Sequence, residues 1–282
     1  MGGLARRANA IEAVRRERAD VLLFDGGNCW WGAPGLSRQS QARLNVEAMN
    51  LMEYHAMALG ASDLALGEVA LSERIAEADF AVLSANVFVP TRGELLGRPY
   101  VVLEVSGRRI GVIGITASSV VTTTLESGSL PTMDPYPGSV VSGASRLGTW
   151  INDDLVVLDP GRGLQRYAGK LAESADIIVV LSNLGWPANV ELAGRVSEVD
   201  LIISAGAAAD LQTKPWQAPS GVWLCQAGVS GQKRPGEMLA EVYLSVDGSG
   251  HITQARGSQT VLSPQMKNNS RIIELFQRYR GQ

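Results

Sequence analysis

The chain has 282 residues, of which 45% are hydrophobic and 19% are charged, a composition that fits one large globular domain and argues against wholesale disorder. Its formal net charge is −3, so no basic field covers the chain and we expect no nucleic-acid partner. No apolar run is long enough to span a bilayer, and no apolar segment follows the N-terminal arginines, so we expect neither a transmembrane segment nor a signal peptide within this sequence.

The first part of the chain alternates helical stretches with short apolar runs. Its periodicity predicts, in order, a surface helix over 5–18, a buried strand over 21–24, helices over 41–59 and 71–77, and a strand over 81–85. Two β-rich runs, 100–105 and 109–115, flank a short glycine turn, which is typical of a hairpin.

Residues 117–153 break this rhythm, because they are rich in Ser, Thr, Gly and Pro and show little periodicity. A loop this long inside a domain is usually functional or flexible. We therefore expect an irregular insertion, either a flexible one or an interaction arm with Tyr136 and Trp150 as its anchors.

Regular elements resume after the insertion. The pattern predicts a strand over 155–158, a helix over 161–174, a strand over 177–181, a helix over 188–196, a strand over 201–204, two paired strands over 222–227 and 239–246, a strand over 252–256 and a closing helix over 269–280. Strands bracketed by helices, followed by hairpins, predict a mixed sheet system with helices outside, in a single domain over residues 1–282.

Several segments, taken in order, resemble the N-terminal catalytic domain of the 5′-nucleotidase family within the calcineurin-like metallophosphoesterases. Residues 175–185, for example, end in Leu-Ser-Asn-Leu-Gly where the family has Leu-Ser-His-Leu-Gly. The matching segments are 2–7, 22–28, 48–60, 85–87, 107–114, 175–185, 199–203 and 226–231. The resemblance covers residues 2–246 and implies a four-layer α/β/β/α sandwich, in which two mixed sheets are flanked by helices.

The resemblance also implies where the two metal ions of the family would bind. In that family the metals clamp the attacking water and the phosphate. The mapped positions are Asn28 for the bridging aspartate, Ala61, Ser62 and Asp63 for an Asn-His-Glu triplet, Asn183 for a histidine, and Gly206 and Ala208 for a final His-x-His. Most of these residues are neutral or have no side-chain atom that can bind a metal, and the chain has only two histidines. We therefore expect no metal and no other cofactor.

The remnant of this cleft would consist of Asn28, Ser62, Asp63 and Asn183. Asp63 could bind a lone cation or cap a helix, and the cap is favoured. Cys29 has no mapped base beside it, which argues against a nucleophile.

Trp30 and Trp31 follow the mapped metal loop directly. They are either a protein contact surface or a filling of the vacated cavity. The sequence leaves both possibilities open.

Three functions fit these observations. The favoured hypothesis is a catalytically inactive phosphoesterase-like protein that is a structural or interaction subunit of a larger assembly and has protein partners. The alternatives are a divergent metal-dependent phosphoesterase and a small-molecule binder in the vacated cleft. The resemblance implies a periplasmic or other extracytoplasmic location, although the sequence itself shows no export signal.

Overall fold

The computed structural model describes residues 3–31, 35–118, 148–151, 154–205, 212, 214–226 and 238–281, with only the backbone described for 148–151. Within these residues the helices are α1 (Gly3–Glu17), α2 (Leu36–Gln39), α3 (Arg43–Leu51), α4 (Glu68–Glu77), α5 (Pro160–Leu171), α6 (Trp186–Ala193) and α7 (Ser270–Arg280), with a short 3₁₀ turn η1 (Asp63–Leu66). The strands are β1 (Phe24–Asp25), β2 (Ala56–Ala58), β3 (Ala81–Leu83), β4 (Val87–Val89), β5 (Glu94–Leu95), β6 (Tyr100–Val105), β7 (Arg108–Ile115), β8 (Gly148–Ile151), β9 (Leu155–Leu158), β10 (Ile177–Ser182), β11 (Leu201–Ser204), β12 (Trp216–Gln217), β13 (Trp223–Gln226), β14 (Met238–Val246) and β15 (Ile252–Val261).

A six-stranded sheet in the order β12-β13-β11-β10-β7-β6 forms one of the two inner layers. Its four central strands are parallel, whereas β6 and β12 pair antiparallel at the two edges. Along β10, Ile178 and Val180 pack with α5 and α6, whereas Val179 and Leu181 face the other inner layer. The unbroken apolar run of β10 is therefore explained by burial on both faces.

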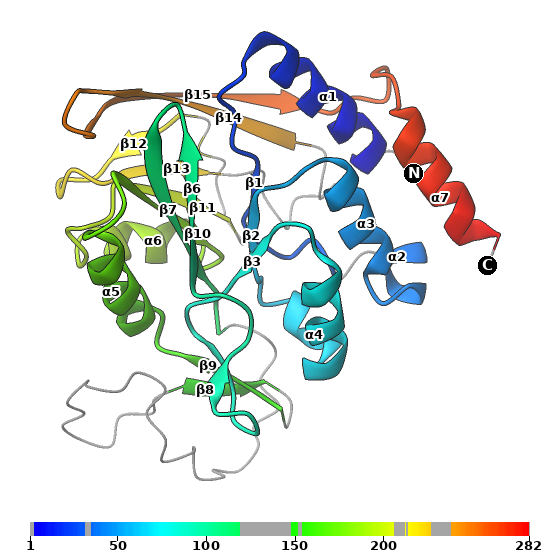
Figure 1. The fold of residues 1–282 in the computed structure, drawn as a ribbon, viewed down its shortest axis with the longest axis horizontal. Helices are drawn as coiled ribbons and strands as arrows, with labels where there is room; N and C mark the ends of the chain where they lie inside the picture. The colour runs from blue at the N-terminus through cyan, green and yellow to red at the C-terminus, as the bar shows by residue number, and fades with distance from the viewer. Residues whose placement is uncertain are drawn as a thin grey trace.

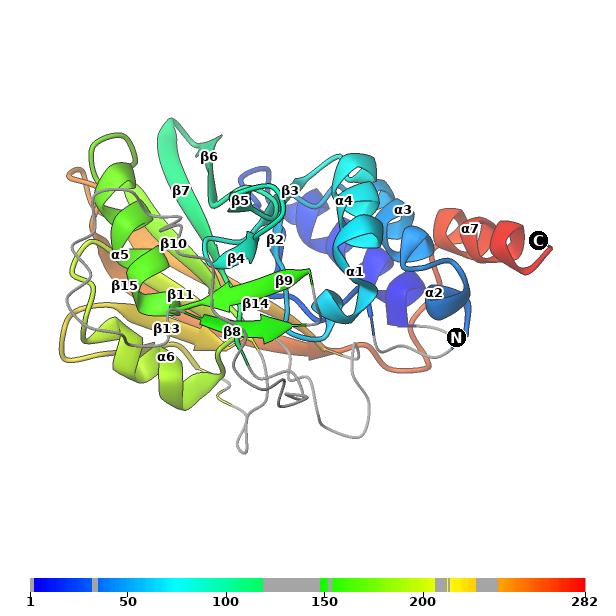
Figure 2. The same ribbon diagram turned by 90° about the horizontal axis from the view of Figure 1, so that it is seen from below.

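The second inner layer contains the parallel sheet β1-β2-β3. Ala56 and Ala58 of β2 face the six-stranded sheet, whereas Met57 packs among α1, α3, α4 and α7. Figures 1 and 2 show these helices on one side of the sheets and α5 and α6 on the other. The expected four-layer α/β/β/α sandwich is confirmed.

Two small sheets complete the sandwich. The hairpin β14-β15 packs Val242 and Leu244 into the interface between the inner layers. The sheet β5-β4-β9-β8 lies at the lower end in Figure 1, where Phe88 packs with the α5–α6 side and Val87 with the opposite side.

The predicted helix over 41–59 is wrong beyond residue 51. α3 ends at Leu51, and Glu53 adopts a left-handed φ of 53°. Arg15 of α1 donates hydrogen bonds to the carbonyl oxygens of Met52 (2.8 Å) and Glu53 (2.7 Å), so these carbonyl groups after the end of α3 have hydrogen-bond partners. The apolar residues that follow form the fully buried β2 instead of another helical turn.

Two further expectations need correction. The strands over 222–227 and 239–246 were expected to pair with each other, but β13 pairs with β11 and β12, whereas β14 pairs with β15. Part of the irregular stretch 117–153 is regular, because residues 148–151 form β8 against β9. Tyr136 lies outside the described residues, as does the side chain of Trp150.

Candidate functional site

The loops after β1, β2 and β10 bring together the residues expected in the remnant cleft. Asn28, Ser62 and Asn183 all lie just beyond the carboxyl ends of parallel strands. This is the edge at which open α/β sheets usually bind ligands.

The Asn28 side chain is held by the loop that follows β2. Its Oδ1 accepts hydrogen bonds from the backbone N–H of Ser62 at 2.8 Å and from the Ser62 hydroxyl at 2.9 Å. Asn28 has a φ of 64°, a left-handed conformation that asparagine adopts more readily than most residues. Protein donors therefore already occupy both acceptor positions of this oxygen.

Asp63 is fully buried and organises the loop that carries Asn28. Its Oδ2 accepts from the N–H groups of Asn28 (2.8 Å) and Gly60 (2.9 Å), and its Oδ1 accepts from those of Trp30 (2.9 Å) and Trp31 (3.2 Å). Burial raises the pKa of Asp63 to about 6, although these four N–H groups favour the carboxylate.

This arrangement corrects both expectations for Asp63. Its side chain caps no helix, because it bonds to the N–H groups of the 28–31 loop and of Gly60. It also has no oxygen left open for a lone cation, since each oxygen already accepts two hydrogen bonds.

Asn183 joins the loop after β10 to the loop after β2. Asn183 is only 4% exposed, and its Oδ1 accepts a hydrogen bond from the N–H of Ala61 at 3.0 Å. Its own backbone N–H donates to the carbonyl oxygen of Ile115 at 2.9 Å. The Asn183 Nδ2 is buried and has no hydrogen-bond partner among the described residues.

Glycines allow the backbone segments of the site to lie against each other. A Cβ atom on Gly60 would lie 2.2 Å from the backbone nitrogen of Asn28 and 2.4 Å from its Oδ1. A Cβ atom on Gly26 would lie 2.3 Å from the Cβ of Ala205. The loops are thus packed in direct contact at these points.

A second group of buried polar residues supports the site and was missed in the sequence. Asn86 accepts from the N–H of Thr116 at 2.9 Å and donates to the carbonyl oxygens of Thr116 (2.8 Å) and Leu158 (3.1 Å). The Thr116 hydroxyl donates to the carbonyl oxygen of Leu59 at 2.8 Å. The sequence offered only their positions as a signal, because Asn86 and Thr116 each lie at the end of a mainly apolar run.

The two tryptophans beside Asn28 differ in environment. Trp30 is completely buried in the core with Met49 and Leu64, so it is not an exposed contact residue in this structure. Trp31 is half-buried, and the Arg38 guanidinium lies 5.5 Å from the centre of its ring. Only Trp31 of the pair is available as a contact residue.

Cys29 is not arranged as a nucleophile. Burial, together with the charges of Asp25 and Asp63, raises the pKa of its thiol well above the ordinary value. Its Sγ lies 3.8 Å from the Met49 Sδ. A thiol with a raised pKa is mostly protonated and unreactive.

Neither histidine belongs to the site. The Nδ1 of His55 accepts a hydrogen bond from the N–H of Leu23 at 3.0 Å, so His55 joins β1 to β2. His251 is exposed in the turn between β14 and β15, where its Nδ1 lies 2.8 Å from the Ser249 hydroxyl.

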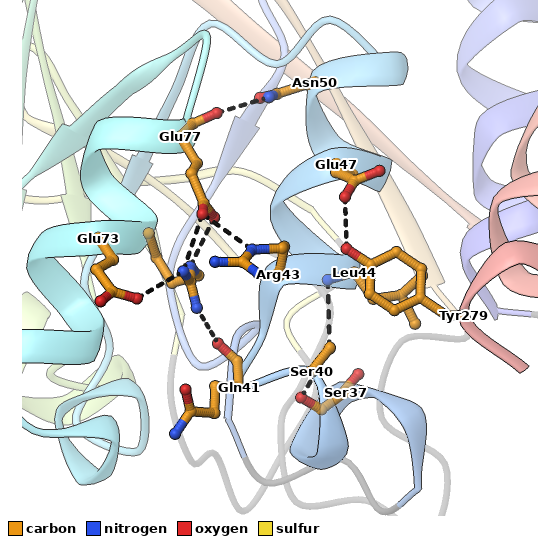
Figure 3. A network of polar contacts seen from close by, with 11 residues as sticks. Ser37, Ser40, Gln41, Arg43, Leu44, Glu47, Asn50, Glu73, Glu77 and Tyr279 are labelled. Atoms are coloured by element: carbon orange, nitrogen blue, oxygen red, sulfur yellow. Dashed lines mark hydrogen bonds and ion pairs between the residues drawn. The ribbon is translucent and has the colours of Figure 1, made fainter. Parts of the chain in front are cut away.

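A polar network outside the site fixes the turn between α2 and α3 (Figure 3). Arg74 of α4 is 1% exposed, pairs with Glu77 at 2.7 Å and donates to the carbonyl oxygen of Gln41 at 3.1 Å. Gln41 and Ala42 both have left-handed φ angles, 46° and 66°. The network therefore stabilises a strained turn and is structural.

Comparisons with known proteins agree with this geometry. Human 5′-nucleotidase is 26% identical over 280 residues, which is 93% of this chain and 44% of that protein. The solved 5′-nucleotidase precursor of Thermus thermophilus is 25% identical with a TM-score of 0.76, and the match covers 99% of this chain and 53% of that one. The chain is a homologue of 5′-nucleotidases with the calcineurin-like phosphoesterase fold.

The fold alone recurs in the calcineurin-like phosphoesterase YfkN from Bacillus subtilis, which is 21% identical with a TM-score of 0.74 over 99% of this chain and 89% of that one. No family model matches the chain. The chain spans between 31% and 49% of the length of the 5′-nucleotidases from snake venoms and mammals that it matches.

The two-metal centre implied by this family does not fit the residues present. Asn28 and Asn183 offer neutral amide oxygens that already accept hydrogen bonds, and the side chain of Ala61 has no atom that can bind a metal. Neutral oxygens alone bind transition metals poorly. Across the described ranges no three His, Cys, Asp or Glu side chains cluster as a metal site. The mapped positions Gly206 and Ala208 lie outside those ranges.

No helix in the described part of the chain has the length and apolar character needed to cross a membrane.

Proposed function

We propose that this 5′-nucleotidase-like chain has lost metal-dependent hydrolysis and is a structural or interaction subunit of a larger assembly, with no metal or other cofactor. The observation that carries the proposal is the state of Asn28. The position mapped to the bridging aspartate is neutral, and Ser62 donates two hydrogen bonds to its only side-chain oxygen. Two adjacent cations repel each other, so a neutral bridge already bound by protein donors favours an empty centre.

The preserved framework supports a role for the surface of the fold. Trp31 is the contact candidate that stays partly exposed, with the Arg38 guanidinium beside its ring. Tyr136 and Trp150, in the 117–153 insertion, complete the proposed contact set. The resemblance to exported enzymes supports an extracytoplasmic location, and the partners we propose are proteins.

A turnover assay tests the proposal against the divergent hydrolase. The purified chain is offered a nucleotide and phosphate-ester panel with added Mn²⁺, Co²⁺ or Zn²⁺, and we expect no turnover above that of a buffer blank. The variant Asn28→Ala is assayed in parallel. Turnover that is present in the parent chain and disappears in Asn28→Ala would overturn the proposal, whereas turnover that is equal in both comes from a contaminating enzyme.

One observation favours a second candidate, a small-molecule binder. The buried Asn183 Nδ2 is a hydrogen-bond donor with no acceptor among the described residues, and buried donors are rarely left unpaired. A ligand with an acceptor oxygen would satisfy it. Thermal-shift screening with nucleotides and sugar phosphates tests this candidate, with Asn183→Ala as the control in which any shift must vanish.

A further inference from the structure

Trp31 and Arg38 form an aromatic and cationic pair beside the remnant cleft. The Arg38 guanidinium lies 5.5 Å from the centre of the Trp31 ring, which is within the range of a cation–π contact. Arg38 is exposed, and within the described residues its side chain makes no ion pair and donates no hydrogen bond. Tryptophan and arginine are among the residues that most often dominate the binding energy of protein interfaces. The pair is therefore a candidate anchor for a partner.

A buried amide ties together the two segments that carry the pair. The Ser37 hydroxyl of α2 donates to the Asn45 Oδ1 at 2.5 Å, and the Asn45 Nδ2 donates to the carbonyl oxygen of Cys29 at 2.6 Å. Asn45 is only 6% exposed. Ser37 directly precedes Arg38, and Cys29 lies on the same loop as Trp31. The Asn45 amide therefore holds the two segments at a fixed spacing.

Further hydrogen bonds fix each segment separately. The N–H of Trp31 donates to the Asp63 carboxylate at 3.2 Å, and its carbonyl oxygen accepts from the Ser62 hydroxyl at 3.4 Å. After the end of α2, the Ser40 hydroxyl accepts from the N–H of Leu44 at 3.3 Å (Figure 3). An anchor that is held in this way loses little conformational freedom on binding, which lowers the free-energy cost of association.

The charge of Arg38 is not balanced by its neighbours. It is the only charged residue in the sequence from position 26 to position 42. The next cation, Arg43, is already paired with Glu77 at 2.9 Å. Asp63 is fully buried and already accepts four N–H groups. An exposed guanidinium without an ion-pair partner is complementary to a carboxylate, with which arginine can form two parallel hydrogen bonds.

We propose that the Trp31–Arg38 pair is the docking anchor for a carboxylate-bearing segment of a partner protein. An Asp or Glu side chain of that segment pairs with Arg38, and an apolar side chain beside it packs on the Trp31 ring. The inference rests on the proposed function as an interaction subunit, and it adds the chemistry of the partner. An anionic membrane fits less well, because binding to a lipid surface through charge needs a cluster of basic residues, whereas this surface offers a single one.

Selection of a random peptide library on the immobilised chain tests the chemistry of the partner. We expect the selected peptides to share an Asp or Glu next to an apolar residue. A synthetic peptide of the selected sequence should bind about thirtyfold more weakly to Trp31→Ala and to Arg38→Glu than to the parent chain. The matched control is Arg195→Glu, because Arg195 is also exposed but follows α6, on the opposite side of the sheets. It should leave peptide binding unchanged.

The carboxylate itself is tested in the selected peptide. Exchange of its Asp or Glu for Asn or Gln should weaken binding to the parent chain and make no difference to binding by Arg38→Glu. Selected peptides without an acidic residue, or peptides that bind Arg38→Glu as tightly as the parent chain, show the proposal to be wrong. Retention of the parent chain, but not of Arg38→Glu, on phosphatidylglycerol vesicles when the library yields no acidic peptide indicates a membrane instead and also contradicts it.

A photo-crosslinking residue in place of Gln39, which is exposed beside Arg38, tests the same anchor in the cell. We expect the cross-linked partner peptide to contain an Asp or Glu whose replacement by Arg restores the complex that Arg38→Glu loses. A complex that forms equally well with Arg38→Glu and Trp31→Ala keeps the proposed interaction function and overturns the anchor. A chain that cross-links to no protein in its own cells overturns the interaction function together with the anchor.

Discussion

Replacing Gly60 with alanine probes the closed packing of the remnant site. The added methyl group would lie 2.2 Å from the backbone nitrogen of Asn28 and 2.4 Å from its Oδ1, well inside contact distance. Neither group can rotate away freely. The backbone nitrogen belongs to a residue at positive φ, and the oxygen accepts two hydrogen bonds from Ser62.

The expected effect follows from the interactions that must move. Overpacking of a well-packed region costs about 1–3 kcal/mol. Moving Asn28 also weakens its hydrogen bonds to Asp63 and Ser62, each worth about 1 kcal/mol net. We therefore expect Gly60→Ala to lower the free energy of unfolding by about 3–5 kcal/mol.

Denaturant unfolding measures this change, with Gly169→Ala as the matched control. Gly169 lies inside α5, and a Cβ atom there would meet nothing within 4 Å. The same substitution should raise the free energy of unfolding by about 0.5–1 kcal/mol at that position. If Gly60→Ala were as stable as the parent chain, the loops after β1 and β2 would not be in direct contact and the described site geometry would be refuted.

Three further predictions concern titration and reactivity. Burial raises the pKa of Asp63 from 3.8 to about 6, so its contribution to the free energy of unfolding should fall by about 2 kcal/mol as the pH rises from about 4 to about 6. A carboxyl ¹³C titration with a midpoint below 4 would argue against it. Burial, aided by Arg15, lowers the pKa of His55 below 6.5, so stability should be lost as the pH falls below that value. His55→Asn keeps an acceptor for the Leu23 N–H and should reduce this acid loss, and an unchanged pH profile would count against the bond. Burial raises the pKa of Cys29 well above its ordinary value and that of Cys225 to about 12, so neither thiol should react with iodoacetamide at neutral pH until the chain is unfolded, and rapid labelling of the folded chain would disprove this.

The apolar patterning predicted most of the strands and the outer helices, whereas the four layers were predicted only through the family resemblance. The apolar run over 177–181 predicted a strand, and the structure buries β10 between α5–α6 and the second inner layer. β2 could not be predicted in the same way. Its three residues are continuous with the apolar pattern of α3, and the chain leaves the helix because Arg15, distant in sequence, binds the carbonyl oxygens of Met52 and Glu53.

The candidate site was predictable only as a set of positions. The resemblance places Asn28, Ser62 and Asn183 at the ends of neighbouring strands, and the structure joins their loops by hydrogen bonds. The role of Asp63 was not predictable, because a short-range pattern suggests a helix cap, whereas three of its four donors come from a loop more than thirty residues away and the fourth is Gly60. The pairing of β13 was not predictable either, because its parallel partner β11 lies about twenty residues earlier in the chain, whereas β14 pairs with β15, the strand that follows it directly.

Equilibrium dialysis against Mn²⁺ or Zn²⁺, followed by elemental analysis of the protein, tests the central claim most directly. The hydrogen-bonded, neutral Asn28 and Asn183 predict that the folded chain retains no stoichiometric metal. Retention of two metal ions per chain that is lost in Asn28→Ala would contradict the proposed loss of the metal centre. It would favour a metal-dependent hydrolase instead.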